Sequence, residues 1–240
     1  TAESIRKNFK LIKNISMERI QSEFTKIILS NDPDRGLMLL RKLGFSDFLV
    51  EEFKNVKLIN CYDLYDDIHD TYGLINSLPK KLHVRLAGLF YKVFNSENAV
   101  EKCRTILKKL KYDNNTINDT CNLVENINNI SCNMTRKKLK LLINSVGTEN
   151  IFDLLDLQKS YLSYMDEYDT ECIDILKNRV SDILASKEPI FIKDLAITGN
   201  DLITELNFKP GKNIGVILNF LLENVMQTPE LNNKEDLLNL

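Results

Sequence analysis

Glycine and proline are scarce in this chain, with eight glycines and five prolines among 240 residues. Both residues supply the tight turns that connect short β-strands, so a sandwich or a barrel needs many more of them. Long helices joined by short loops need few. The scarcity therefore predicts an all-α fold.

Composition and termini indicate where such a protein works. The chain is 43% hydrophobic, which is enough for a substantial core. No apolar run approaches the roughly 18 residues that a membrane span requires, so we expect no membrane partner. The first residues, Thr-Ala-Glu-Ser-Ile-Arg, do not show the basic-then-apolar pattern of a signal peptide. We expect a cytoplasmic protein.

The charges nearly balance, with 32 basic and 34 acidic residues and a net charge of −2. RNA binding, if present, must therefore come from local basic patches. Cysteine spacing argues against a zinc site, because no Cys-x-x-Cys pair occurs. We expect reduced, mostly buried thiols. The five cysteines are Cys61, Cys103, Cys121, Cys132 and Cys172.

Near the N-terminus, two helices are marked by their caps. Ser16 is placed to cap the first, whose inner face contains Ile20, Phe24, Ile27 and Ile28. Pro33 suits the first position of the second helix, which we expect to stop at Gly44.

The C-terminal part predicts two more helices joined by a turn at Pro210-Gly211. Asn200 or Asp201 is expected to cap the first, which runs through Leu206. The start of the second leaves backbone N–H groups from Gly211 to Ile214 free beside Lys209 and Lys212, which makes a phosphate seat. The alternative is a helix–turn–helix that only finishes a domain. The apolar face of the second helix comprises Ile214, Ile217, Leu218, Leu221, Leu222 and Val225.

The same C-terminal residues resemble the tail of bacterial class II tRNA nucleotidyltransferases, the family of CCA-adding enzymes and poly(A) polymerases. The matching residues are Thr198, Gly199, Asp201, Leu202, Lys209, Pro210, Gly211, Ile214, Gly215, Leu221, Leu222, Val225, Pro229 and Asn232. A second match resembles the neck of this family: Ser16, Glu18, Arg19, Ile20, Glu23, Gly36, Leu37, Leu39, Leu40, Leu43 and Gly44. The resemblance implies an extended array of small helical modules. These are a neck remainder at residues 1–44, a body at 45–146 and a tRNA-binding tail at 147–240.

The catalytic head of the family is not matched. The family needs two carboxylates spaced Asp-x-Asp on a strand to hold two Mg²⁺ ions. The one such pair in the sequence, Asp32-Pro33-Asp34, reads as a helix cap followed by a first-turn acid. Glu235-Asp236 resembles the base-selecting motif without its arginine. We therefore expect no catalytic residue in this chain, and the resemblance assigns Mg²⁺, CTP and ATP to a head in cis.

The body of some relatives resembles a metal-dependent phosphohydrolase. In this chain Arg85-Leu-Ala-Gly-Leu89 continues into Phe90-Tyr91, where those relatives have His-Asp. His69 and His83, the two histidines, cannot supply a metal site. We expect no metal, and we interpret both histidines as ordinary surface or helix residues.

Two basic segments are the candidate RNA contacts. One is Lys209, Gly211, Lys212 and Asn213 at the tail turn. The other is Arg136, Lys137, Lys138 and Lys140, where Asn133 or Thr135 caps a helix. Cations at a helix N-terminus oppose its dipole, so an anionic partner or a solvated surface explains them. Helix-end capping explains Lys108, Lys109 and Lys111, and packing is preferred to base stacking for Tyr161, Tyr164 and Tyr168.

The resemblance implies a chain that grips the acceptor stem and T arm of tRNA and positions its 3′ end for CCA addition from CTP and ATP. Ser16, Glu18, Arg19 and Glu23 would support the neck beneath the nucleotide pocket. Two alternatives stay open. The parent could be a poly(A) polymerase or an A-adding or CC-adding variant, or the chain could be a stand-alone helical interaction module without activity.

Overall fold

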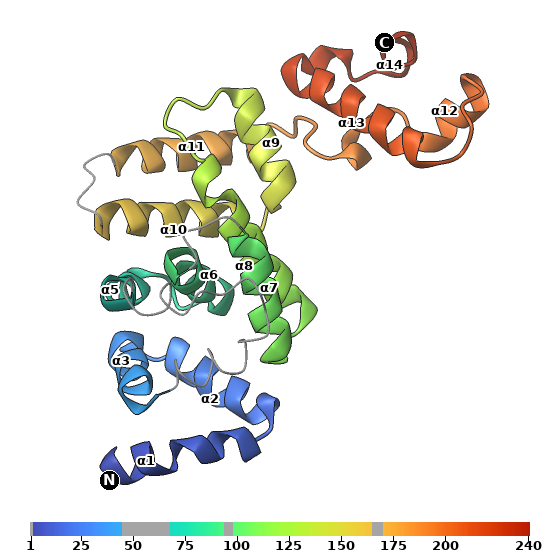
Figure 1. Ribbon diagram of the computed structural model, residues 1–240. Coiled ribbons are helices and arrows are strands. Elements are labelled where there is room, and N and C mark those ends of the chain that lie inside the picture. Colours follow the sequence, from blue (N-terminus) through green and yellow to red (C-terminus); the bar gives the residue numbers. More distant parts are fainter. Residues whose placement is uncertain (1, 45–67, 94–97, 165–169) are drawn as a thin grey trace. The chain divides into compact units, whose positions relative to one another are not determined.

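The computed structural model describes residues 2–44, 68–93, 98–164 and 170–240 (Figure 1). Every regular element in these ranges is an α-helix or a short 3₁₀ helix, and none is a strand. The prediction of an all-α fold is confirmed. Among the described helices, none combines the length and apolar character that crossing a bilayer requires.

The described chain divides into two compact units. The first contains residues 1–128 and 153–170, and the second contains residues 129–152 and 171–240. The division into modules at residues 44 and 146 concerns the family resemblance and stays a prediction.

The first unit is a stack of short helices in which α6 is central. This helix packs against α5, α8 and α2, while α2 also packs on α3. Its elements are α1 Ala2–Asn8, η1 Phe9–Asn14, α2 Met17–Ile28, α3 Pro33–Leu43, α5 Ile68–Ser77, α6 Leu82–Val93, α7 Ala99–Lys109, α8 Asn114–Asn126, η2 Ile127–Asn129 and α10 Ile151–Tyr164.

Local signals place the helices near the N-terminus as expected. The Oγ atom of Ser16 accepts the N–H of Arg19 at 3.4 Å, which caps α2. Pro33 begins α3, and Gly44 follows its last residue with a φ of 96°, a conformation that favours glycine. These predictions are confirmed. Of the expected inner face of α2, Ile20, Phe24 and Ile28 are buried and Ile27 is half-buried.

Arg85 joins two helix ends inside the first unit. Its side chain is buried on α6, and Nη1 donates to the carbonyl oxygens of Ile28 at 2.7 Å and Ser30 at 2.9 Å. Nη2 donates to the carbonyl oxygen of Leu78 at 3.2 Å. These carbonyls lie at or just after the C-terminal ends of α2 and α5, where the helix has no further N–H groups to donate to them. One guanidinium therefore satisfies several buried acceptors.

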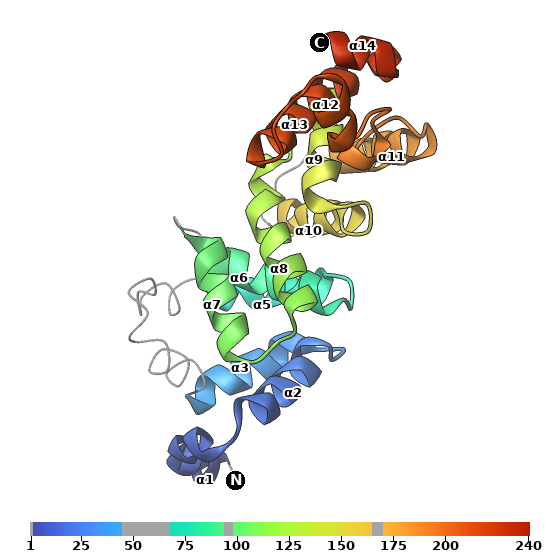
Figure 2. The ribbon, with the colours of Figure 1, turned by 90° about the vertical axis from the view of Figure 1, so that its right-hand side faces the viewer.

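The second unit is built around α13, which packs against α9, α12 and η4 (Figure 2). The apolar face predicted for α13 is confirmed, because Leu218, Leu221, Leu222 and Val225 are buried and Ile214 and Ile217 pack against them. The elements are α9 Arg136–Val146, α11 Glu171–Ala185, η3 Ile192–Asp194, α12 Gly199–Glu205, α13 Lys212–Gln227, η4 Pro229–Leu231 and α14 Lys234–Asn239.

The cap expected for α12 is corrected by the structure. Thr198, rather than Asn200 or Asp201, precedes the helix, and its N–H donates to Asp201 Oδ2 at 2.7 Å. The N–H of Asp201 donates back to Thr198 Oγ1 at 3.4 Å. Thr198 and Asp201 thus form a reciprocal capping box, and the helix ends at Glu205 rather than Leu206.

One further expectation is wrong, and it concerns the cysteines. Reduced thiols are expected from the sequence, but Cys132 and Cys172 form a disulfide. The fold brings their Cα atoms to 5.4 Å across 40 residues of sequence. Cys103 and Cys121 are free and buried as expected, and Cys61 lies outside the described residues.

Candidate nucleic-acid interface

The first basic segment forms the start of α9. Thr135 Oγ1 accepts the N–H of Lys138 at 3.3 Å, so the predicted cap at Thr135 is confirmed. Arg136 and Lys138 are exposed and Lys137 is half-buried. Lys140, one turn further on, is fully buried. This burial contradicts its placement on an accessible basic strip.

Glu188 is the anionic partner of two of these cations. Its carboxylate bonds Arg136 Nη2 at 2.5 Å and also pairs with the ammonium of Lys140. Lys140 Nζ donates a further hydrogen bond to the carbonyl oxygen of Met226 at 3.1 Å. The hydrogen bond from Arg136 and the charge of Lys140 lower the pKa of Glu188 to about 2, against a smaller opposing effect of burial.

The pairing with Glu188 changes what the cation cluster indicates. The unfavourable placement of cations at the N-terminus of α9 pointed to an anion, and for Arg136 and Lys140 the chain itself supplies it. Lys137 and Lys138 remain available to an outside ligand. Lys137 borders a cavity of about 360 Å³. Its lining is Thr135, Arg136, Lys137, Lys140, Glu188, Met226, Gln227 and Pro229.

The second basic segment is the connection between α12 and α13. Every residue from 204 to 213 is exposed, which includes Lys209, Gly211, Lys212 and Asn213. One expected feature is corrected, because the N–H of Ile214 donates to the Gly211 carbonyl at 3.1 Å and is not free. The N–H groups of Lys212 and Asn213 lie in the first turn of α13, where helices lack internal acceptors.

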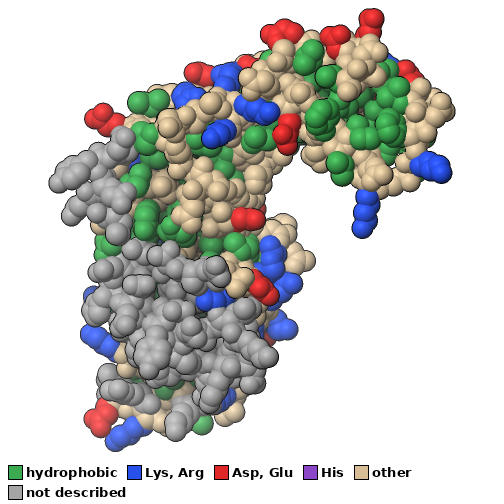
Figure 3. Space-filling view, turned by 45° about the horizontal axis from the view of Figure 1, so that its top comes forward, with side chains coloured by type: hydrophobic (Ala, Val, Ile, Leu, Met, Phe, Trp, Pro, Cys, Tyr) green, Lys and Arg blue, Asp and Glu red, His purple; other side chains and the backbone are tan. Residues whose placement is uncertain are grey.

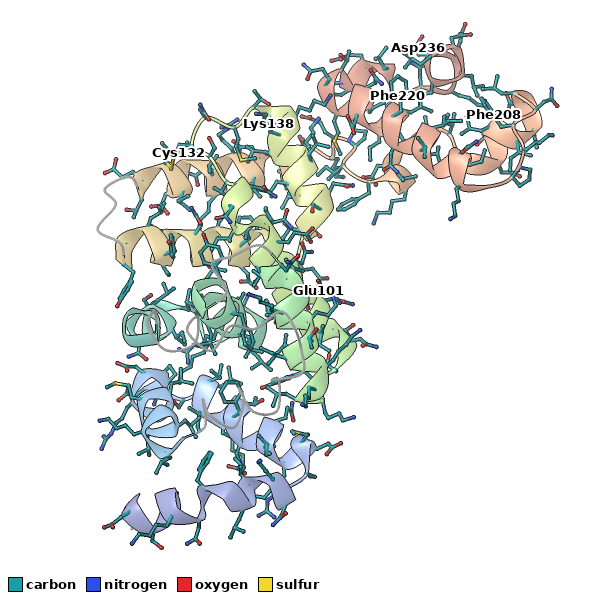
Figure 4. The ribbon with its side chains drawn as sticks, viewed as in Figure 1. Glu101, Cys132, Lys138, Phe208, Phe220 and Asp236 are labelled. Carbon is teal, nitrogen blue, oxygen red and sulfur yellow. A yellow bond between two sulfur atoms is a disulfide. The ribbon has the colours of Figure 1, made fainter. Side chains whose placement is uncertain are left out.

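The structure adds an apolar surface to this basic turn. Val216 and Phe220 on α13 are 68% and 56% exposed. Leu206 and Phe208, which precede α13, are 41% and 40% exposed. Lys212, Val216 and Phe220 are spaced four apart, so they form one stripe opposite the buried face. Figure 3 shows hydrophobic side chains gathered over the C-terminal helices, and Figure 4 labels Phe208 and Phe220. Sequence analysis missed this stripe, although its spacing was visible.

Comparison with known proteins places the chain in a family. A family model described as "tRNA nucleotidyltransferase domain 2 putative" matches residues 89–240, which is more than half of the chain. The chain belongs to the tRNA nucleotidyltransferase family. A second model, "Probable RNA and SrmB- binding site of polymerase A", matches residues 1–57.

A curated relative extends the same assignment. The CCA-adding enzyme of Ligilactobacillus salivarius (strain UCC118) is 26% identical over 250 residues, which covers 99% of this chain and 53% of that protein. The chain thus spans about half the length of this nucleotidyltransferase. No solved structure matches the chain.

The residues predicted to support a neck lie on α2 or cap it. Glu18, Arg19 and Glu23 are exposed, and Glu23 pairs with Lys26 of the same helix at 2.8 Å. The hydrogen bond from Lys26 lowers the pKa of Glu23. Ser16 caps the helix, so its supporting role is local. An apolar groove of about 380 Å³ runs beside them and is lined by Ile12, Ile15, Arg19, Ile20, Glu23, Phe24, Ile27 and Leu40.

His83 is more than an ordinary helix residue, because it contacts a buried carboxylate on α10. Its Nε2 atom lies 2.9 Å from Asp153 Oδ2, and Lys81 Nζ lies 2.7 Å from Asp153 Oδ1. Asp153 is buried at the start of α10, so both contacts hold the start of α10 against the start of α6. The side chain of His69 lies outside the described residues. No group of three or more His, Cys, Asp or Glu side chains in the described ranges could hold a metal.

The Asp-x-Asp pair of this chain lies at a helix start. Asp32 Oδ1 accepts the N–H of Arg35 at 3.3 Å, and Asp34 is a first-turn acid of α3. The interpretation as cap and first-turn acid is confirmed. These two carboxylates flank a proline at a helix start rather than alternating on a strand, so they do not fit a paired Mg²⁺ site.

The tyrosines are packing residues where the structure describes them. The ring of Tyr161 meets that of Tyr91 edge to face, with centroids 5.3 Å apart. The ring of Tyr164 covers Gly73, where a Cβ atom would lie 2.9 Å from it. Tyr168 lies outside the described residues. Lys108 and Lys109 occupy the last turn of α7, where the helix dipole favours cations.

Proposed function

We propose that this chain is the RNA-binding part of a tRNA nucleotidyltransferase that adds or repairs the 3′-terminal CCA of tRNA from CTP and ATP. The observation that carries the proposal is the pair of family matches, which together account for residues 1–57 and 89–240. The similarity to an enzyme named for CCA addition supports the substrate. The exposed basic and apolar turn in the tail supplies a surface suited to RNA.

The tail turn would bind both the phosphates and the bases of an RNA. Lys209 and Lys212 would pair with phosphates, and the first-turn amides of α13 would add hydrogen bonds. The rings of Phe208 and Phe220 would stack on unpaired bases of the RNA. Lys137 and Lys138 would contribute a second phosphate contact. Because the net charge is only −2, the grip on the acceptor stem and T arm would rely on shape and local contacts.

The chemistry would belong to the head in cis. That head would hold Mg²⁺ and select CTP and ATP, while this chain would hold tRNA at a fixed distance and bind no cofactor itself. Asp32 and Asp34 serve a helix end, which supports the assignment of no catalytic residue to this chain. A tRNA substrate would place the enzyme in the cytoplasm.

A charge-reversal pair tests the binding surface. Lys209→Glu with Lys212→Glu should raise the Kd for tRNA at least about tenfold and flatten its salt dependence by roughly 0.7–0.9 per lost phosphate contact. Filter binding at several salt concentrations measures both. Lys108→Glu with Lys111→Glu is the matched control, because it makes the same charge change at exposed sites elsewhere. Equal effects of the two pairs, or no effect of either, would refute the tail assignment.

A second candidate function is poly(A) polymerase, or an A-adding or CC-adding variant. The description of the match at residues 1–57, which names polymerase A, favours keeping it. Sequencing the 3′ ends made by the full-length protein on tRNA lacking CCA separates these activities. A chain that does not bind tRNA even at low salt would instead be an interaction module.

A further inference from the structure

The Cys132–Cys172 disulfide joins the segment before α9 to the start of α11 (Figure 4). Cys132 is exposed, whereas Cys172 is the second residue of α11 and is 7% exposed. A separate contact holds the same segment, because Arg179 Nη2 on α11 donates to the Met134 carbonyl at 2.7 Å. The segment therefore has one covalent and one non-covalent attachment to α11.

We propose that Cys132–Cys172 is a reversible thiol–disulfide site, opened by a dithiol reductant that attacks Sγ of Cys132, the exposed residue of the pair. A thiolate of the reductant bonds to Cys132 Sγ, the protein S–S bond breaks, and its electron pair leaves on Cys172 Sγ, which takes a proton from water. The second reductant thiol then displaces Cys132. Two electrons and two protons pass to the protein, and the reductant becomes a cyclic disulfide.

The surroundings of the two sulfurs favour this direction of attack. A reagent in solution reaches the exposed residue, Cys132, before the buried one. Cys172 leaves as a thiolate in the first turn of a 15-residue helix, where the backbone N–H groups and the dipole stabilise negative charge. Glu171 and Asp174 in the same turn oppose part of that stabilisation.

Opening the bond does not require the unit to unfold. Met134 is buried and its carbonyl stays bonded to Arg179, while Thr135 still caps α9. Only the few residues around Cys132 lose their covalent attachment. In the reducing compartment that the proposed function implies, a disulfide is expected to be transient or redox-responsive rather than permanent. That clause alone rests on the proposed function.

Cys103 and Cys121 provide an internal comparison. Both are buried between α7 and α8, and the hydrogen bond with Cys121 together with burial raises the pKa of the Cys103 thiol well above its ordinary range. A protonated, inaccessible thiol reacts slowly with electrophiles and disulfides. The hydrogen bond with Cys103 lowers the pKa of the Cys121 thiol, so burial is what keeps Cys121 from reacting. Both cysteines should therefore stay unmodified in the native protein.

Redox titration of the native chain tests the proposal. Protein equilibrated with mixtures of reduced and oxidised dithiothreitol is pulsed with N-ethylmaleimide, and each cysteine is followed by peptide mass mapping. Cys132 should become labelled as reductant rises, with loss of the linked Cys132–Cys172 peptide, and should be protected again on reoxidation, while Cys103 and Cys121 stay unlabelled. The Tm should fall by roughly 5–10 °C on reduction, because the closed loop spans 40 residues.

Two variants complete the test. Cys132→Ser removes an exposed thiol and should show the lower Tm at every redox ratio, whereas Ser131→Ala should respond as the unmodified chain does. Two results would overturn the proposal: Cys132 and Cys172 labelled at every ratio, or a bond that resists dithiothreitol until the protein unfolds. Neither measurement involves tRNA, so failure of the redox site is distinguishable from failure of the proposed function.

Discussion

Among single residues, Glu188 is the one that pairs with two cations of the basic segment at the start of α9. The ammonium of Lys140 is fully removed from water, and an unpaired charge there would cost several kcal/mol. Glu188 supplies the opposite charge and the Met226 carbonyl supplies a further acceptor. The carboxylate therefore stabilises the fold at a position where sequence analysis placed a contact to RNA.

Replacing Glu188 tests this structural role. Glu188→Gln leaves the Lys140 ammonium buried without a carboxylate, so the free energy of unfolding should fall by about 3 kcal/mol. Urea denaturation at pH 7 measures it. Glu223→Gln, at an exposed carboxylate on α13, should change stability by less than about 0.5 kcal/mol. Similar values for the two variants would show that the ion pair contributes nothing.

The same carboxylate predicts a pH dependence. Its pKa is about 2 in the folded chain, lowered from an ordinary value of 4.5. A lowered folded-state pKa gives stability that is complete above pH 4.5 and is lost as pH falls toward 2. The stability gap between the unmodified chain and Glu188→Gln should therefore be full at pH 7 and shrink steadily between pH 5 and pH 3. Denaturation midpoints across this range measure it, and a constant gap would contradict the assignment.

At the scale of elements, close helix approach depends on glycines at particular contacts. A Cβ atom on Gly36 in α3 would lie 2.6 Å from Ile27 Cγ2 in α2, which is well inside contact distance. Gly199 makes a similar approach possible between α12 and α13, where Ile214 Cγ2 would lie at 2.8 Å. By contrast, a Cβ on Gly215 in α13 meets no atom within 4 Å. Alanine should therefore be unfavourable at Gly36, where a neighbouring side chain occupies the space, and acceptable at Gly215, where the space is open.

An alanine pair tests this difference. Gly36→Ala forces α2 and α3 apart or displaces Ile27, so stability should fall by about 1–3 kcal/mol. Gly215→Ala meets no obstacle and gains helix propensity, so stability should rise by roughly 0.5–1 kcal/mol. Thermal and urea unfolding of both variants provide the values. A stabilising Gly36→Ala would mean that α2 and α3 are less tightly packed than the structure shows.

For the whole molecule, the proposed function assigns tRNA binding to this chain and nucleotide addition to a head in cis. The chain spans 53% of its CCA-adding relative, and its Asp-x-Asp pair lies at a helix start. A chain that holds tRNA without paired metal-binding carboxylates can bind the substrate and still not extend it.

Nucleotide incorporation tests this separation. The chain with tRNA lacking its CCA end, Mg²⁺, CTP and labelled ATP should add no nucleotide, because its Asp-x-Asp pair lies at a helix start and does not fit a paired metal site. A full-length CCA-adding enzyme in the same mixture is the positive control. Incorporation by the chain alone would show that catalytic groups were missed.

Sequence analysis predicted the features that depend on near neighbours. The all-α class, the cap at Ser16, the start at Pro33, the stop at Gly44 and the buried face of α13 were all predicted correctly. Each is set by residues within about one helical turn or by a 3.6-residue period, so the spacing in the sequence is also the spacing in the structure. The cap of α12 was misassigned by two or three residues, because Thr198, Asn200 and Asp201 are all competent caps.

The tertiary structure alone decided which distant groups meet. The disulfide joins residues 40 apart, Glu188 reaches Arg136 across 52, Arg85 reaches Ile28 across 57, and His83 reaches Asp153 across 70. Such pairings follow from how helix faces pack, which spacing along one segment does not encode. Burial has the same origin: Lys137, Lys138 and Lys140 look alike in sequence, but only the last points into the core. Sequence therefore specified helices and family, and packing determined which charges remain free to meet RNA.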